Sequence, residues 1–172
     1  MKCTALGLLV AAGCSGNAEP EAKPFHMPDG WERVDLSKLP APLPATIAVP
    51  KGARVTSQGF GECAGKPAAI AKIYVDDERA IQLLQCTEYF DEKVATRAGV
   101  IRHHKDQKMT GSNRVPTGEW VVSFEPKVEF SSDFKDGHYV IGLSPRLGVM
   151  CQGFGTLDGE RARTICLSLE PT

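Results

Sequence analysis

The sequence predicts an α+β fold: a single domain with a mainly antiparallel sheet and two helices, stapled by two disulfides. Three observations predict it. Apolar runs are joined by hairpin-length connections, two segments carry apolar residues at helical spacing, and an even number of cysteines follows a signal-like N-terminus. With 172 residues, 42% of them hydrophobic and 24% charged, the chain suits one domain, which we place at residues 31–172.

The first half of this domain is expected to consist of short strands. Residues 34–36 and 46–49 are strand-like and are separated by a proline-rich stretch. Residues 50–52, Pro-Lys-Gly, match a turn with Pro at its second position and Gly at its fourth. Residues 69–75 and 80–86, separated by four charged residues, have the pattern of a β-hairpin.

Two helices are predicted from the spacing of apolar residues. The first has apolar positions recurring every three or four residues from Phe90 to Ile101, with Arg102 just behind them, where the helix dipole favours a positive charge. The second lies near the C-terminus, where Asp158 can cap a helix. Its apolar face is Ala162, Ile165, Cys166 and Leu169.

The second half adds further strands. Residues 120–124 alternate in the way of a half-buried strand, and residues 149–154 form another apolar run. Asp136-Gly137 suits the turn of a hairpin. Pairing around that turn predicts one apolar ribbon face against the core, with Phe134 opposite Tyr139, Ser132 opposite Ile141 and Phe130 opposite Leu143.

The order of these elements is strands, helix, strands, helix, without a regular β-α-β alternation. This order resembles that of the small Mog1/PsbP-like α+β domains found among secreted and envelope proteins. The resemblance lies in the order of elements alone, and it implies an α+β fold.

The N-terminus has the three regions of a secretory signal peptide: one positive charge at Lys2, an apolar stretch over residues 4–10, and small residues 11–13 before Cys14. Residues 10–14, Val-Ala-Ala-Gly-Cys, resemble the lipobox of bacterial lipoproteins. The resemblance implies that residues 1–13 are removed as a signal peptide and that Cys14 is the lipid attachment site, with palmitate among its acyl chains.

Several consequences follow for the location of the protein. Ser15 stands where retained lipoproteins have Asp, so the resemblance implies export to the periplasm and the outer membrane if the organism is Gram-negative. Residues 14–30 are rich in Gly, Pro, Ala and Glu and predict a lipidated N-terminus and flexible tether. The alternative is a plain signal peptide, cut after Gly13 or Ala18, that releases a soluble protein.

The remaining cysteines predict the disulfides. Cys63, Cys86, Cys151 and Cys166 are an even number in an exported chain, and they permit three connectivities. We favour Cys63–Cys86 and Cys151–Cys166, because each pair closes a short loop. A four-cysteine zinc site is disfavoured, since closely spaced Cys pairs are absent from the sequence.

Other residue patterns give no strong indication of a site. His103-His104, with His26 or His138, could supply metal ligands, but neighbouring helical residues point about 100° apart, which favours a solvated helix end. Ser144 lacks the second glycine of a nucleophile elbow and is more typical of a strand end.

Two glycine pairs and an acidic group are also open to a functional interpretation. Residues 59–61 and 153–155, both Gly-Phe-Gly, lack the spacing of a phosphate-binding loop and predict turn or bulge glycines. Glu129, Asp133 and Asp136 do not form a calcium-loop pattern.

The composition excludes some classes of protein. A formal net charge of −1 creates no field that draws the chain to nucleic acid, so we expect no nucleic-acid partner. The longest apolar run is shorter than the roughly 20 residues that span a bilayer as a helix. The sequence predicts no catalytic residue, metal or cofactor.

We therefore expect a lipid-anchored lipoprotein of the cell envelope that acts as a non-catalytic binding or structural module. Its expected partners are the membrane, through the N-terminal anchor, and an envelope protein. The alternative is a small envelope hydrolase whose site no motif marks.

Overall fold

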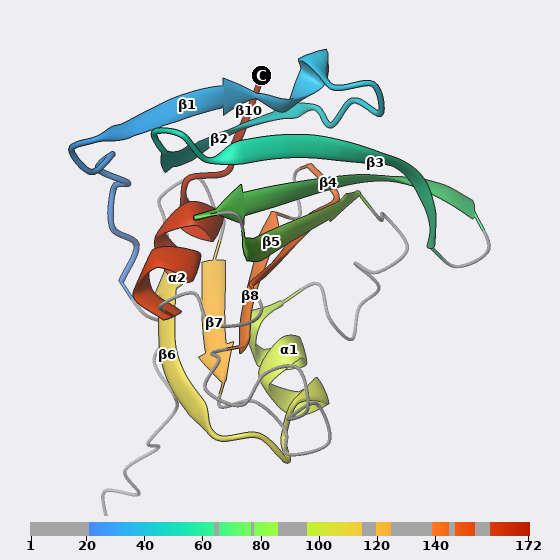
Figure 1. The fold of residues 1–172 in the computed structure, drawn as a ribbon. Helices are drawn as coiled ribbons and strands as arrows, with labels where there is room; N and C mark the ends of the chain where they lie inside the picture. Colours follow the sequence, from blue (N-terminus) through green and yellow to red (C-terminus); the bar gives the residue numbers. More distant parts are fainter. Residues whose placement is uncertain are drawn as a thin grey trace, which may run out of the picture.

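The structure is a computed structural model that describes residues 21–63, 66–76, 78–85, 96–114, 120–124, 139–144, 147–153 and 159–172. These residues form two antiparallel sheets and two α-helices (Figure 1). This confirms the predicted α+β class, with mainly antiparallel strands and two helices.

The larger sheet has seven strands in the order β3-β4-β5-β9-β8-β7-β6, and each neighbouring pair is antiparallel. The smaller sheet has three strands in the order β1-β2-β10. The strands of the larger sheet are β3 (Arg54–Cys63), β4 (Lys66–Val75), β5 (Glu78–Gln85), β6 (Met109–Arg114), β7 (Trp120–Phe124), β8 (Tyr139–Ser144) and β9 (Val149–Gly153). The remaining elements are β1 (Trp31–Asp35), the 3₁₀ helix η1 (Leu36–Lys38), β2 (Ala45–Pro50), α1 (Arg97–His103), α2 (Gly159–Leu167) and β10 (Glu170–Pro171).

The main core lies against one face of the seven-stranded sheet. The small sheet contributes Ile47 and Val49 from β2, α2 contributes Ile165, and the large sheet contributes Ile73 and Leu83; all five are fully buried. Side chains along a strand alternate between the two faces, and residues paired across strands lie on the same face. Ile81, which pairs with Ile73, and Cys151, which pairs with Leu83, therefore lie on this covered face as well. Helix α1 packs on the other face, over β7, where Val100 is fully buried.

The predicted apolar face of the C-terminal helix is confirmed, because Ala162, Ile165, Cys166 and Leu169 are all buried. The predicted strand at residues 149–154 is confirmed as β9. In β7 the expectation of a half-buried strand was wrong. Its residues 121–124 are buried on both faces, because α2 packs on one side of the strand and α1 on the other.

The hairpin predicted at residues 69–86 is confirmed as β4 and β5, but its connection is shorter than expected. Val75 pairs directly with Glu78, so two residues join the strands. Asp76 takes a positive φ of 53°, which a tight two-residue connection requires and which Asp tolerates better than most residues.

The turn after β2 is shifted by one position from the expectation. The Ala53 N–H donates to the Pro50 carbonyl over 3.0 Å, so Pro50 is the first residue of the turn and Gly52 the third. Gly52 has a φ of +87°, which is the conformation that glycine supplies at the third position of a type II turn.

Helix α1 begins later than the spacing indicated. Thr96 has extended backbone angles, φ −124° and ψ 154°, and its side chain accepts a hydrogen bond from the Gly99 N–H over 3.1 Å. Thr96 is therefore an N-cap, and the helix begins at Arg97. Residues 86–95, where the predicted helix had its start, lie outside the described part of the chain.

The predicted ribbon around Asp136-Gly137 is wrong in its pairing. Ile141 lies opposite Val122 on one side and Gln152 on the other, and Leu143 lies between Trp120 and Met150. Both edges of β8 are occupied, so Ser132 and Phe130 cannot pair with it as predicted. The turn itself lies outside the described residues.

Candidate functional site

A disulfide joins the sheet to the C-terminal helix. Cys151 in β9 and Cys166 in α2 are bonded, with their Cα atoms 5.7 Å apart and 15 positions apart in sequence. Both residues are buried. This confirms one of the two predicted bridges. The other, Cys63–Cys86, lies outside what the structure describes, as does Cys14.

Gly142 leaves the space into which this disulfide fits. It lies in β8 opposite Cys151 and faces α2. A Cβ atom at Gly142 would lie 2.8 Å from the Cys166 Cβ, 3.1 Å from a Val121 methyl and 3.4 Å from the Cys151 Cβ. The absence of a side chain at residue 142 therefore allows α2 to pack closely on the sheet.

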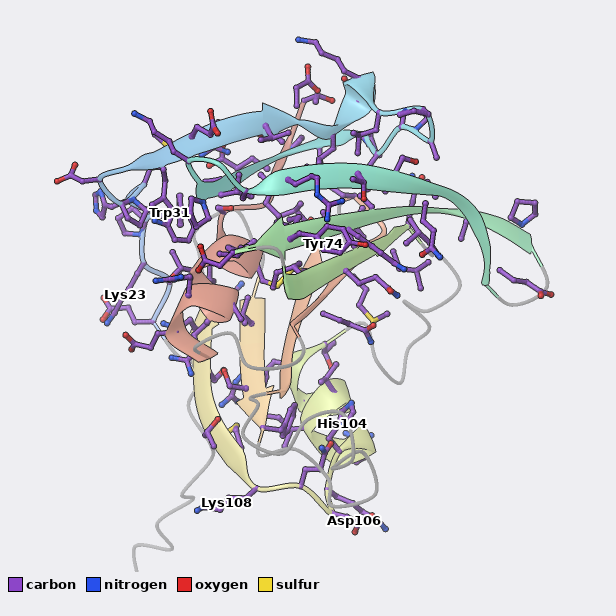
Figure 2. All side chains as sticks on the ribbon, in the orientation of Figure 1. Lys23, Trp31, Tyr74, His104, Asp106 and Lys108 are labelled. Atoms are coloured by element: carbon purple, nitrogen blue, oxygen red, sulfur yellow. A yellow bond between two sulfur atoms is a disulfide. The ribbon has the colours of Figure 1, made fainter. Side chains whose placement is uncertain are left out.

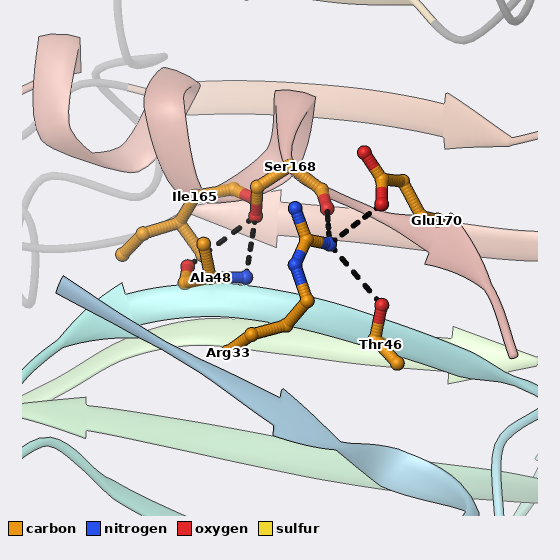
Figure 3. A network of polar contacts seen from close by, with 6 residues as sticks. All are labelled: Arg33, Thr46, Ala48, Ile165, Ser168 and Glu170. Atoms are coloured by element: carbon orange, nitrogen blue, oxygen red, sulfur yellow. Dashed lines mark hydrogen bonds and ion pairs between the residues drawn. The ribbon is translucent and has the colours of Figure 1, made fainter. Parts of the chain in front are cut away.

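A buried serine joins α2 to the small sheet. Ser168, fully buried, accepts a hydrogen bond from the Ala48 N–H over 2.8 Å and donates to the Ile165 carbonyl over 2.7 Å (Figure 3). The Ala48 carbonyl lies 3.3 Å from the same hydroxyl. Because β10 begins only at Glu170, the Ser168 hydroxyl takes the place of a strand backbone beside Ala48.

Arg33 extends this network to the surface. Its Nη1 lies 2.9 Å from a Glu170 carboxylate oxygen, and it also donates to the Thr46 hydroxyl and the Ser168 carbonyl, over 3.1 and 3.2 Å (Figure 3). One guanidinium nitrogen thus contacts β2, β10 and the end of α2. We interpret this cluster as structural, since its contacts connect elements of the fold to one another.

Replacing Ser168 by alanine is expected to lower the free energy of unfolding by about 1–3 kcal/mol, because the buried Ala48 N–H loses its partner. Thr164→Ala in α2, four positions earlier, is the control: its hydroxyl is exposed and donates to the Glu160 carbonyl, a contact that water can replace. Urea denaturation of both variants measures the difference. Equal midpoints for the two would contradict the role given to Ser168.

Two arginines reach serines on opposite faces of the large sheet. Arg163 of α2 donates from Nε to the Ser123 hydroxyl over 2.9 Å, and Ser123 is fully buried. Arg97 of α1 donates from Nε to the Ser112 hydroxyl over 2.7 Å. These contacts explain how the polar strand β6 and its neighbour β7 are held between two helices.

The histidines are not gathered into a metal site among the residues described. His104 Nδ1 and Gln107 Oε1 lie 2.5 Å apart, and the His104 ring stacks on Phe124 with centroids 4.9 Å apart. His26 lies in the segment before β1. Within the described part of the chain, no group of three His, Cys, Asp or Glu side chains is placed to hold a metal ion.

Two other residues considered in the sequence analysis, Ser144 and Gly59, have structural roles in strands. Ser144 is buried and ends β8, as predicted for a strand-end serine. Gly59 has a φ of +86° at a β-bulge in β3, as predicted for a bulge glycine.

Asp35 caps the 3₁₀ helix η1. The hydrogen bond that its carboxylate accepts from the Ser37 hydroxyl, aided by Lys38, holds the pKa of this carboxyl below its usual range.

A row of polar side chains crosses the face of the large sheet opposite α2. Thr56, Lys72, Gln82 and Gln152 lie opposite one another in register on β3, β4, β5 and β9, and each is half-buried. We call these four residues the polar row. Ile70 and Leu84, also half-buried, lie in the next row of the same face. Such a face offers both hydrogen-bonding and apolar contact.

Beside the polar row, a cation–π contact extends the same surface. The Arg54 guanidinium carbon lies 4.0 Å from the centroid of the Tyr74 ring, and these two residues are paired in β3 and β4. Sequence reasoning missed this surface. Its strands were partly predicted, but which residues share a face depends on strand partners that are distant in sequence.

Comparison with known proteins gives no relative for the chain: no family model, curated protein or solved structure matches it. In the described part of the chain, no helix combines the length and the apolar character needed to cross a membrane.

Proposed function

We propose that the chain is a lipid-anchored lipoprotein of the bacterial cell envelope, in the outer membrane if the organism is Gram-negative. Its α+β domain acts as a non-catalytic module that binds another envelope component. The observation that carries this proposal is the Cys151–Cys166 disulfide, because structural disulfides persist in exported proteins and are rare in the cytosol. The lipobox-like residues before Cys14 add the anchor.

The surface that we propose for binding is the polar row with its apolar neighbours Ile70 and Leu84. The strands that carry it are fixed from behind by the main core, so the face is a rigid platform. Half-buried Lys72 and Gln82 present an ammonium and an amide group on neighbouring strands. A protein partner with acidic and amide side chains would match this chemistry.

The anchor is tested by Cys14→Ala. We expect the variant to lose the acyl mass and to leave the lipid-modified membrane pool, because two or three acyl chains are what hold such proteins stably on a bilayer. Intact-mass analysis and fractionation of the envelope measure both effects. A wild-type protein whose mature N-terminus is Ser15 or later, without acyl mass, would contradict the proposal.

The binding surface is tested by site-specific photo-crosslinking in intact envelopes. With the crosslinker at residue 82, we expect one discrete protein adduct, since this position is in the centre of the polar row. The control places the same crosslinker at Lys38 of η1, whose side chain is 81% exposed and lies outside the row. The same adduct pattern at both positions would rule out the polar row as the binding surface.

A further inference from the structure

The segment before β1 is attached to the outer edge of the large sheet. Ala22 forms a parallel bridge with Arg114, and the Lys23 N–H donates to the Arg114 carbonyl over 2.8 Å. Arg114 ends β6, which is the last strand of the seven-stranded sheet on that side. The backbone of residues 22–23 therefore continues the sheet beyond β6.

This attachment limits the distance between the domain and the proposed anchor. Eight positions separate Cys14 from Ala22, and a fully extended chain of that length spans at most about 26–29 Å. This step rests on the lipid anchor proposed above. If Cys14 is lipidated, Ala22 and the end of β6 beside it stay within this distance of the bilayer.

The segments that meet at this edge also carry the exposed apolar side chains. Among the described residues, the large hydrophobic side chains that remain exposed are Met27 and Met109, at 49% and 43%. Met109 begins β6, at the end of the strand away from Arg114, and Met27 lies in the segment between Lys23 and β1. Flexible methionine side chains adapt well to an irregular apolar environment such as the boundary between headgroups and acyl chains.

The charge on these segments is positive although the chain as a whole has a net charge of −1. Residues 21–30 and 96–114 carry six basic and three acidic side chains. The exposed charges are Lys23, Arg102, Lys105 and Lys108 among the basic residues and Glu21, Asp29 and Asp106 among the acidic ones. Figure 2 shows Lys23 and Lys108 near the two ends of β6, on its outer side. Basic side chains close to an anionic leaflet each strengthen attachment roughly fivefold.

We propose that this edge of the domain, which we call the β6 edge (residues 22–27 and 105–114), lies on the membrane surface. Met27 and Met109 enter the headgroup region, and Lys23, Lys105 and Lys108 contact anionic phospholipid headgroups. The polar row is then on strands away from this edge and stays accessible to a partner. The lipid anchor holds the domain in place, and the β6 edge sets its orientation.

The experiment measures methionine oxidation in the lipidated full-length protein on vesicles. One set of vesicles is phosphatidylcholine, and the other is phosphatidylcholine with phosphatidylglycerol. Hydrogen peroxide is uncharged, so its concentration at the surface does not depend on lipid charge, and peptide mass mapping gives the rate of sulfoxide formation. Met150 is 3% exposed and serves as an internal control for an intact fold.

We expect Met27 and Met109 to oxidise at least threefold more slowly on the anionic vesicles than on phosphatidylcholine, with Met150 slow on both. The double variant Lys105→Gln/Lys108→Gln should lose this protection. The control Lys38→Gln/Arg161→Gln removes the same charge from η1 and α2 and should keep it.

The outcomes separate this proposal from the anchor. Equal oxidation rates on the two kinds of vesicle, with the protein bound to both, overturn the membrane-facing edge and leave the lipid anchor standing. Protection that survives Lys105→Gln/Lys108→Gln but is lost in the Lys38→Gln/Arg161→Gln control places the contact elsewhere and also overturns it. A protein without acyl mass that stays in the supernatant overturns both proposals.

Discussion

Ile165→Ala is expected to lower the free energy of unfolding by about 2–5 kcal/mol, the range for large-to-small changes in packed interiors. Ile165 is fully buried in α2, in the core between the two sheets. Removing most of its side chain leaves a cavity that the neighbouring strands cannot fill, because they are fixed by pairing on both sides. Chemical denaturation of the protein under oxidising conditions measures the loss.

The control for this prediction is Arg161→Ala, one turn earlier in α2. Arg161 is exposed, and its contact with Asp76 over 3.6 Å is a surface ion pair, which is worth at most about 1 kcal/mol. If both variants shift the denaturation midpoint equally, the core position of Ile165 does not determine the stability of this helix.

Replacing both Cys151 and Cys166 by alanine is expected to cost about 3 kcal/mol, the value for a disulfide that closes a loop of about 15 residues. The bridge restricts the unfolded chain, and its loss lets α2 detach from β9 more readily. Denaturation of the double variant against wild type, both without reductant, measures the effect.

A second comparison separates the disulfide from the packing of the two cysteine side chains. Wild type and the double variant are both treated with reductant, which also breaks the predicted Cys63–Cys86 bridge in each. The reduced wild type keeps both side chains but loses the bond, so its unfolding midpoint should approach that of the reduced double variant. A reduced wild type as stable as the oxidised protein would show that side-chain packing, not the bond, holds α2 on the sheet.

Local patterns in the sequence were sufficient to predict those elements in which the buried face is consistently apolar. Helix α2 was predictable because its buried residues recur at helical spacing and one face alone meets the core. The β4–β5 hairpin was predictable because two apolar runs enclose a charged connection. The disulfide pairing Cys151–Cys166 followed from the short loop between two predicted elements.

Strand β6 was missed for a physical reason. Its residues, Met-Thr-Gly-Ser-Asn-Arg, show no apolar alternation. The polar side chain of Ser112 is instead bonded by Arg97, and Arg163 lies against Gly111 on the other face. Long arginine side chains from both helices thus cover a strand that has no apolar face of its own, and a sequence window cannot show them.

The misplaced ribbon has a different cause. The Asp136-Gly137 turn signal is local, and it gives no information about which strands flank β8. In the structure β8 lies between β7 and β9, so the apolar character of Ile141 and Leu143 reflects its interior position in the sheet. The candidate surfaces were unpredictable for the same reason, since the polar row and the β6 edge are assembled by pairings distant in sequence.

The close packing at Gly142 has a consequence for how the sequence can change over evolution. With the disulfide intact, α2 cannot move away from β8, so a methyl group at residue 142 meets the Cys166 Cβ directly. Without the bond, the helix has more freedom to move away from the sheet, although the Val121 methyl, 3.1 Å from that position, still limits the space. Gly142 is therefore coupled to Cys151 and Cys166: a side chain at residue 142 costs more in descendants that keep the disulfide than in those that lose it.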